Sequence, residues 1–242
     1  IPFKFMPPEG FSSLASSNQP KGSVLNPKKH FAAITYQGNG SSDGDNQNIT
    51  GLDFTPDLVY ITGRDNATHK QMFSSLYSGK ALATSGNYAE YNFSAMQIKP
   101  RSFDAPYSSS SSYSCNTNGH NYSAYCWKAG GAAVANTDGS ISSQVSVNKE
   151  AGFSIVTYTG TGADGTVGHG LGKVPAVVII KNRDRAVEWI VKHQKLSSGN
   201  ILYLNLNSGE DGATGSNNGI IGDLNNASTF SLTRTSNSGN YN

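Results

Sequence analysis

The chain contains an internal repeat that covers most of its length. The segment Phe31-Ala-Ala-Ile-Thr-Tyr36-Gln-Gly38-Asn-Gly40 returns 122 residues later as Phe153-Ser-Ile-Val-Thr-Tyr158-Thr-Gly160-Thr-Gly162. A second block, from Gly51-Leu52 to Arg64-Asp65, returns 119 residues later between Gly170-Leu171 and Arg183-Asp184. A weaker echo at the same spacing relates Asn118, Asn121 and Tyr122 to Asn237, Asn240 and Tyr241. A repeat unit of this size is a whole domain, so the sequence predicts two related domains in tandem.

Composition and the spacing of the apolar segments predict an all-β fold. Only 14% of the residues are charged, against roughly 25% in an ordinary soluble domain, and Gly, Ser, Asn and Thr fill the difference. These residues favour tight turns, and short apolar segments recur at spacings of about 10 residues. We predict strands near 30–36, 57–62, 121–127, 141–147, 153–158, 174–181, 186–191, 201–206 and 229–233, and a helix of about two turns at 191–197. The expected fold class is two tandem related antiparallel β-sandwich domains, jelly-roll-like, behind an extended N-terminal lead-in.

The repeat also predicts the domain boundaries. Residues 1–27 are rich in proline and form the lead-in or linker, residues 28–150 form the first β-sandwich repeat, and residues 151–242 form the second. Asn121-Tyr122 continues into Ser-Ala-Tyr-Cys-Trp127, whereas Asn240-Tyr241 is followed only by Asn242. We therefore expect the second repeat to be truncated, with an open strand edge near Tyr241. A neighbouring subunit, a continuation of the chain or residues 1–14 would fill that edge. Since position 1 is Ile, we expect the chain to be processed or a fragment.

The charge distribution indicates which classes of partner the chain is not expected to bind. The chain has 18 basic and 16 acidic residues, a net charge of +2, and its densest basic run is only Lys28-Lys29-His30. A groove for nucleic acid needs clustered lysine and arginine, so we expect no nucleic-acid partner. No stretch approaches the roughly 18 apolar residues of a membrane span, so we expect no membrane insertion.

Two pairs of residues are candidates for structural links. Cys115 and Cys126 flank a turn-rich loop and could form a disulfide across a hairpin; the alternative is two free thiols in a reducing compartment. Arg64-Asp65 and Arg183-Asp184 are the charged residues held in both copies, each after a buried strand. They form structural ion pairs at the strand end or belong to a ligand pocket, and we favour structural ion pairs because they are retained together with scaffold residues.

Several motifs that suggest chemistry lack the context that the chemistry requires. Gly160-Thr-Gly162-Ala-Asp-Gly165 matches a dinucleotide-binding pattern, but the following glycines cannot open a helix, so we interpret it as a hairpin turn. Ser42 matches a nucleophile elbow, but a polar loop follows it. Residues with oxygen-bearing side chains alternate along 43–48 as in a calcium-binding loop, yet Phe54 stands where such a loop has Glu. We interpret the segment as an exposed acidic turn, and a weak cation site is the alternative. The five histidines show no metal-ligand spacing. We therefore assign no catalytic, cofactor-binding or metal-binding residue, and expect no cofactor.

The repeated residues resemble a known family. Asn26-Pro-Lys-Lys-His-Phe31, Gly51-Leu-Asp-Phe-Thr-Pro-Asp-Leu-Val-Tyr-Ile61, Tyr125-Cys-Trp-Lys-Ala-Gly-Gly131 and Asp138-Gly-Ser-Ile-Ser-Ser-Gln-Val-Ser-Val147 resemble a repeated domain in virion proteins of tailed bacteriophages, especially marine and cyanophage-like ones. In that family the repeats often follow a SPRY or concanavalin-like sandwich, and residues 1–11 are similar to the exit of such a domain. The resemblance implies a viral structural protein in the virion, an extracellular particle assembled in the host cytoplasm. It carries over no catalytic residue.

Two classes of function follow. The first is a non-enzymatic structural component of a bacteriophage particle, such as a tail fibre, spike or capsid appendage, used for host attachment. Its expected partners are further copies of the chain, most simply in a trimer, other virion proteins and a host surface glycan. The alternative is a carbohydrate-binding module or a glycan-degrading β-sandwich enzyme, for which Asp53, Asp57, Glu90, Asp164, Glu188 and Glu210 would be the candidate carboxylates. Trp127 and Trp189 fit core packing as well as a sugar-stacking platform.

Overall fold

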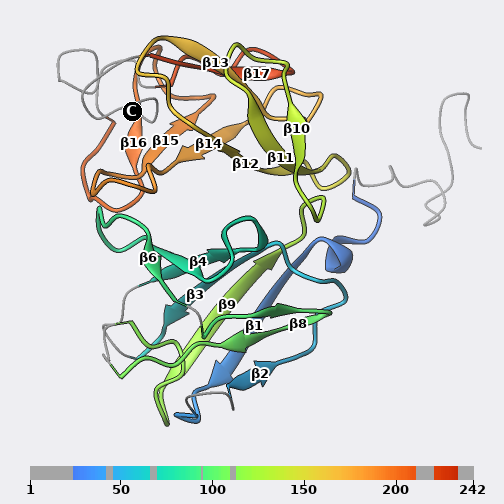
Figure 1. The fold of residues 1–242 in the computed structure, drawn as a ribbon, viewed down its shortest axis with the longest axis vertical. Helices are drawn as coiled ribbons and strands as arrows, with labels where there is room; N and C mark the ends of the chain where they lie inside the picture. Colours follow the sequence, from blue (N-terminus) through green and yellow to red (C-terminus); the bar gives the residue numbers. More distant parts are fainter. Residues whose placement is uncertain are drawn as a thin grey trace, which may run out of the picture.

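The computed structural model describes residues 24–41, 46–65, 70–93, 95–109, 113–210 and 221–233. These residues form an all-β molecule with two groups of strands, and its described helical segments are the 3-10 turns η2 (Pro27–Lys29) and η3 (Ser75–Tyr77) (Figure 1). The first group contains β1 (Phe31–Gln37), β2 (Gln47–Ile49), β3 (Leu58–Gly63), β4 (Gln71–Ser74), β5 (Lys80–Ala83), β6 (Tyr91–Asn92), β7 (Ile98–Lys99), β8 (Ser102–Ala105) and β9 (Asn121–Trp127). The second group contains β10 (Val134–Asn136), β11 (Ser143–Asn148), β12 (Phe153–Tyr158), β13 (Gly165–Gly168), β14 (Val177–Ile180), β15 (Ile190–His193), β16 (Leu202–Tyr203) and β17 (Thr229–Leu232).

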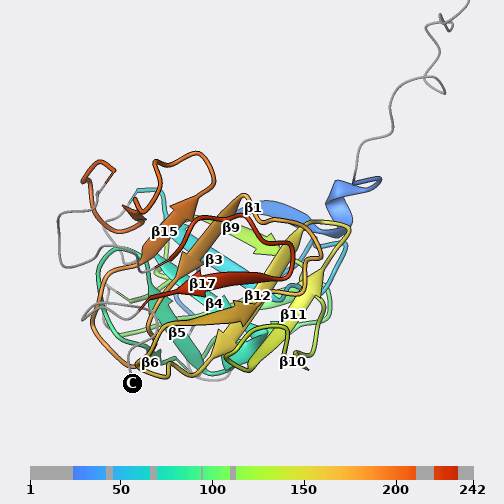
Figure 2. The ribbon, with the colours of Figure 1, turned by 90° about the horizontal axis from the view of Figure 1, so that it is seen from above.

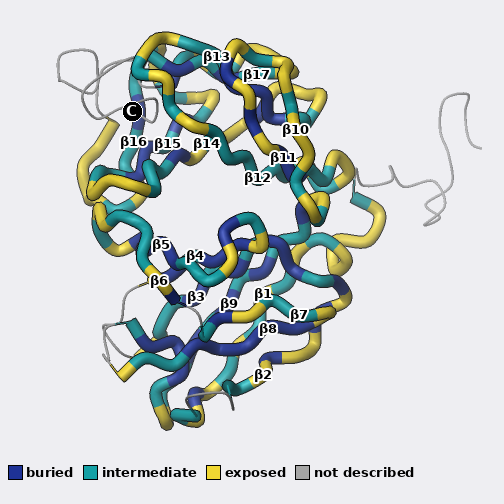
Figure 3. The backbone as a smooth tube through the Cα atoms, in the orientation of Figure 1, coloured by how far each residue is buried: buried dark blue, intermediate teal, exposed yellow. Residues whose placement is uncertain are grey.

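The first group is β-sandwich-like. A six-stranded antiparallel sheet has the order β1-β9-β3-β4-β5-β6, and a smaller sheet has the order β2-β8-β7. Strand β9 alternates half-buried and buried residues, which places Tyr122, Ala124 and Cys126 on the inner face. These side chains share one core with Phe103 of the smaller sheet. Figure 3 shows that buried residues concentrate inside this group.

The second group consists of three open antiparallel sheets around a second core. Their orders are β10-β11-β12, β14-β15-β16 and β13-β17. Apolar side chains from all three sheets meet in this core, among them Val156, Val167, Ile180, Ile190 and Phe230. Seen from above, β17 runs across the direction of β12 and β15 (Figure 2).

Several pairings follow the sequence repeat. The meander β3-β4-β5 is matched by β14-β15-β16, and the pair β2-β8 is matched by β13-β17. The ring of Tyr36 meets Phe103 of β8 edge-on at 6.4 Å, and the ring of Tyr158 meets Phe230 of β17 edge-on at the same centroid distance of 6.4 Å. The same tyrosine therefore contacts the same neighbouring strand in both copies.

Backbone conformation explains why both copies of the repeat keep certain glycines. Gly51 and its counterpart Gly170 have φ values of +100° and +71°, in the left-handed region that favours glycine. Gly40 and Gly162 also agree, with φ values of 73° and 72°. These turns therefore require glycine in each copy.

The strand grouping differs from the boundary expected after residue 150. Strand β11 pairs with β12 along Ser143–Asn148, so residue 150 lies in the hairpin turn that joins two paired strands. Strands β10 and β11 thus belong to the second group, although the sequence repeat counts them with the first copy. The lead-in up to residue 23 and the expected open edge near Tyr241 lie outside the described residues.

Two local predictions are wrong. Residues 190–193 form strand β15 rather than a helix, because Ile190 and Lys192 alternate into the interior at period two. The glycines at 160–165 do not form a hairpin turn: β12 pairs with β11 and β13 pairs with β17, so this segment connects two different sheets. No helix in the described ranges is long and apolar enough to cross a membrane.

Candidate functional site: a lysine-lined groove and an aromatic row

The connection between the two groups of strands is fixed by a buried carboxylate. Asp57, which follows Pro56 at the start of β3, is only 4% exposed. Its Oδ2 accepts hydrogen bonds from the N–H groups of Ala129 at 2.8 Å and Gly131 at 3.3 Å, and its Oδ1 accepts one from the Ser75 hydroxyl at 3.2 Å. Charge-assisted bonds of this kind hold the backbone that leaves β9 in one position. The start of the second group is therefore attached to the first.

A second contact joins the groups at the far end of the large sheet. The buried indole of Trp189 donates its Nε1 hydrogen to the Ala83 carbonyl at 2.9 Å and packs against Tyr77 and Leu82. Beside it, the Arg183 guanidinium forms an ion pair with Glu90 and lies 5.0 Å from the centroid of the Tyr77 ring. This contact buries the Trp189 side chain beside a partly exposed ion pair, so it resists separation of the two groups.

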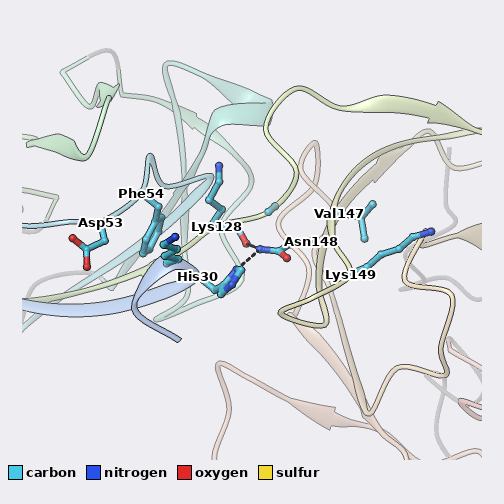
Figure 4. Close-up of a pocket in the computed structure, with 9 residues that line it drawn as sticks. His30, Asp53, Phe54, Lys128, Val147, Asn148 and Lys149 are labelled. Carbon is cyan, nitrogen blue, oxygen red and sulfur yellow. Dashed lines mark hydrogen bonds between the residues drawn. The ribbon is translucent and has the colours of Figure 1, made fainter. Parts of the chain in front are cut away.

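A groove lies where the ends of β9 and β11 meet η2. Its volume is about 770 Å³, and it is lined by Lys29, His30, Asp53, Phe54, Lys128, Ala129, Val147, Asn148 and Lys149. Figure 4 shows His30 and Asn148 near its centre, with Asp53 and Phe54 on one side, Lys149 on the other, and Lys128 pointing in a third direction. The groove is lined by three lysines and one aspartate. The Lys128 ammonium lies 3.9 Å from the buried Asp57 carboxylate and Asp53 pairs with Arg101, so Lys29 and Lys149 supply most of its positive charge. Because Lys128 and Lys149 point in different directions (Figure 4), the groove suits an extended anionic ligand better than a single small ion.

Two polar contacts of Asn148 join the segments at the centre of the groove. The Asn148 side-chain amide donates to the Lys128 carbonyl at 3.1 Å and lies 2.8 Å from Nδ1 of His30. Since the amide nitrogen is a donor, Nδ1 accepts and the ring proton lies on Nε2, which is 3.5 Å from Glu150. These contacts hold the backbone at Lys128 and the ring of His30 next to β11.

A row of aromatic side chains lies on the half-buried face of β9 and its neighbouring strands, and two of its members are chain neighbours of groove residues. The ring centroids of Phe31 and Trp127 lie 5.2 Å apart. These two residues directly adjoin the groove residues His30 and Lys128 in the chain. Trp127 stacks on Phe153 of the second group at 6.2 Å, and the row continues through Tyr125, 6.5 Å from Trp127, to Tyr60, 6.1 Å further. Phe31 is exposed and the other four rings are half-buried. Aromatic faces of this kind stack on sugar rings, and lysines next to them bind acidic substituents.

The charged pairs predicted from the repeat do not line this groove. Both carboxylate oxygens of Asp65 accept the N–H of Asn121, at 3.0 and 3.1 Å, so this carboxylate holds the first residue of β9. The Asn121 backbone bond is the main cause that lowers the pKa of Asp65. Arg183 forms its ion pair with Glu90 instead of Asp184. Within the described residues, Arg64 and Asp184 take part in no ion pair.

The cysteines do not form the proposed disulfide in this structure. Cys115 and Cys126 are both free and buried. They do not lie on two arms of one hairpin, because β9, which carries Cys126, pairs with β1 and β3. Burial raises the pKa of Cys126 to about 12 and also raises that of Cys115. A thiol with such a pKa is a poor nucleophile at neutral pH.

The carboxylates proposed for glycan cleavage bind other groups. Asp57 holds the connection, and Glu90 forms ion pairs with Lys80 and Arg183. Asp53 binds Arg101, Glu188 binds the amides of Asn87 and Asn205, and Glu210 accepts the N–H of Ser197. The described residues include no cluster of histidine, cysteine and carboxylate side chains that could hold a metal ion. Asp43 and Asp45 of the calcium-like loop lie outside the described residues.

Sequence reasoning missed the groove. Its residues come from four separate segments, and the repeat does not retain its lysines. The run Lys28-Lys29-His30 was the available signal, and it is too short to indicate a site.

Residues 26–242 match the model of a protein family described as a domain of unknown function (DUF7483). No curated protein and no solved structure matches the chain significantly.

Proposed function

We propose that this chain, which belongs to the DUF7483 family, is a non-enzymatic structural component of a bacteriophage particle that contacts a glycan of the bacterial surface. The observation that carries the glycan contact is the lysine-lined groove, whose residues His30 and Lys128 are chain neighbours of Phe31 and Trp127 in the aromatic row. Stacking rings next to lysine ammonium groups match a polysaccharide with acidic substituents. The virion setting rests on the motifs that resemble repeats of tailed-bacteriophage proteins.

The engagement of the carboxylates supports a non-enzymatic role. A glycosidase needs two carboxylates free to act about 5–10 Å apart across a cleft. Asp57 and Glu90 are instead bound to backbone N–H groups or basic side chains that hold the molecule together. Asp53, the carboxylate that lines the groove, binds Arg101.

The repeated pairings support a finer description of the architecture. We propose two related β-sandwich-like domains in tandem that associate as a trimer in a fibre, spike or capsid appendage, where one groove per subunit gives multivalent attachment. Sedimentation at micromolar concentration measures the association. A stable monomer contradicts the trimer.

The glycan contact is tested by binding to bacterial polysaccharides that differ in charge. We expect an acidic polysaccharide to bind more tightly than a neutral one, and its affinity to fall with added salt because ions screen exposed charges. Lys128→Ala and Lys149→Ala should each weaken binding about two- to fivefold. Lys173→Ala is the matched control, since Lys173 is exposed and does not line the groove. Equal loss in all three variants contradicts a groove site.

The same incubation tests the enzymatic alternative. A carbohydrate-binding module or particle protein leaves the polysaccharide intact, whereas a glycan-degrading enzyme releases reducing ends. If the intact chain continues to release reducing ends over many turnovers, the proposal of a non-enzymatic structural protein is contradicted. Labelling the chain in micrographs of an intact particle tests whether it belongs to tail or capsid.

A further inference from the structure

A second cavity lies between the two groups of strands. Its volume is about 390 Å³, within the range of roughly 300–1,000 Å³ that is common for ligand pockets. The first group contributes Asp57, Ser75 and Leu76 to its walls, and the second contributes Gln144 and Thr157, together with the connecting residues 131–133. The cavity and the lysine-lined groove share no lining residue, so they are two separate sites. Ligands often bind where two domains meet, which makes this cavity a candidate binding site.

The strand faces that line the cavity are those through which the two groups contact each other. Phe153 and Thr157 lie on the same face of β12, because side chains alternate along a strand. The ring of Phe153 stacks on Trp127 of the first group at 6.2 Å. From the first group, Leu76 packs against the buried cluster that contains Trp189. Contacts between the groups therefore hold both the Thr157 wall and the Leu76 wall in place.

Two polar side chains of the second group line the cavity side by side. Gln144 of β11 and Thr157 of β12 lie directly opposite each other in the register of these strands. Within the part of the chain that the structure describes, neither the Gln144 amide nor the Thr157 hydroxyl has a hydrogen-bond partner. An amide side chain offers both a donor and an acceptor, and so does a hydroxyl. The pair can therefore bind neighbouring hydroxyl groups of one ligand.

Other parts of the wall are apolar. Leu76 is half-buried, and the connection adds the small side chains of Ala132 and Ala133. A sugar ring carries hydroxyl groups around its edge and C–H groups on its faces. A cavity with a few polar groups on one wall and apolar side chains on another matches both parts of such a ring.

The charge of the cavity is already balanced. Its one charged lining residue is Asp57, whose carboxylate accepts hydrogen bonds from Ala129, Gly131 and Ser75. The Lys128 ammonium lies 3.9 Å from the same carboxylate. A second negative charge beside a buried carboxylate is unfavourable, and a cation would have to compete with the existing partners. The cavity therefore favours an uncharged ligand, whereas the groove favours an anionic one.

We propose that this cavity binds an uncharged sugar residue, whose hydroxyl groups contact Gln144 and Thr157 while a C–H face contacts Leu76. The inference rests on the proposed function where it takes the sugar to be part of a surface glycan. The binding of a neutral sugar itself requires only the cavity. A glycan of mixed composition then places an acidic residue in the groove and a neutral one in the cavity.

The test titrates the isotope-labelled chain with glucose and, in a separate sample, with glucuronate, which has the same ring and an added carboxylate. We expect glucose to shift the NMR signal of the Gln144 side-chain amide, which is assigned by its absence in Gln144→Ala. Glucuronate should bind at this site at least about threefold more weakly, because the Asp57 carboxylate repels it. Galactose and N-acetylglucosamine extend the test to two other neutral sugars.

Variants of the polar pair identify the site. Gln144→Ala should weaken binding of the neutral sugar about three- to tenfold. Gln194→Ala is the matched control, since Gln194 is exposed and lines neither the cavity nor the groove. Thr157→Val removes the hydroxyl at nearly constant shape and should weaken binding by a similar factor, whereas Thr157→Ser retains a hydroxyl and should restore it. An unchanged midpoint of thermal unfolding shows that each variant is folded.

Three outcomes overturn the proposal. The first is that none of the three neutral sugars shifts the Gln144 signal, even if the groove binds an acidic polysaccharide. The second is that neutral-sugar binding persists undiminished in Gln144→Ala and Thr157→Val. The third is that Lys149→Ala abolishes neutral-sugar binding, which assigns the sugar to the groove. Since we expect Lys149→Ala to weaken only the acidic polysaccharide, the cavity proposal and the proposed function can fail separately.

Discussion

At the scale of single residues, polar side chains determine how the two groups of strands are connected, and Asp57 is the clearest case. Asp57→Ala leaves the N–H groups of Ala129 and Gly131 without their carboxylate, and Ala129 is buried. We expect the free energy of unfolding to fall by about 2–4 kcal/mol, measured by urea denaturation. Asp53→Ala is the control: its ion pair with Arg101 has exposed side chains on both sides and should contribute less than about 1 kcal/mol. Equal losses would contradict the role of Asp57.

A second residue-scale prediction concerns acid. Lys192 is only 1% exposed, and its ammonium group donates to Asp223 at 2.8 Å and to the Asn200 carbonyl at 2.9 Å. The bond from Lys192, with smaller contributions from Ser198 and Gly199, lowers the pKa of Asp223 from 3.8 to about 2. Because the folded pKa is the lower one, the carboxylate stabilises the fold above pH 3.8, and this stabilisation is lost as the pH falls through about 2.

Thermal unfolding between pH 5 and pH 2 tests this assignment. Asp223→Asn should lower the unfolding midpoint at pH 5 and reduce the further drop between about pH 4 and pH 2. Asp138→Asn is the control, because among the described residues the Asp138 carboxylate binds the amide of Asn136 and no basic side chain. Parallel curves for the wild type and Asp223→Asn would count against the assignment.

At the scale of elements, turn geometry decides which positions the repeat retains. Gly51 connects β2 to β3 with a φ of +100°, and a Cβ atom built there would meet no atom within 4 Å. Gly51→Ala therefore causes backbone strain without a clash and should cost about 1–2 kcal/mol of unfolding free energy. Gly209→Ala is the matched control, since its Cβ also enters open space and its φ is outside the left-handed region. We expect a change of no more than about 0.5 kcal/mol there, and chemical denaturation of both variants checks the difference.

At the scale of the whole molecule, the contact around Trp189 couples the two groups of strands. Trp189→Ala removes a buried ring between the groups and should cost about 3–5 kcal/mol. We expect differential scanning calorimetry to change from one transition to two, because the groups then unfold separately. Trp189→Phe keeps the apolar packing and loses the bond to Ala83, so it should cost about 1 kcal/mol and retain a single transition. A single transition in Trp189→Ala would show that the connection at residues 128–133 is sufficient for coupling.

The sequence by itself determined the all-β character and many of the strands, since alternation in Asn121–Trp127 and apolar runs such as Phe153–Tyr158 are local patterns that act through a two-residue period. It also determined which turns need glycine, because the left-handed φ at Gly51 and Gly170 is a property of one residue. Only the tertiary structure decided that β11 joins β12, that Arg183 pairs with Glu90, and that lysines from three separate segments line one groove. Residues 190–193 form a strand because burial of Lys192 against Asp223 and two carbonyls outweighs a weak local helix preference. Such choices depend on edges and charges that are distant in the chain, and a local pattern carries no information about which of them will meet.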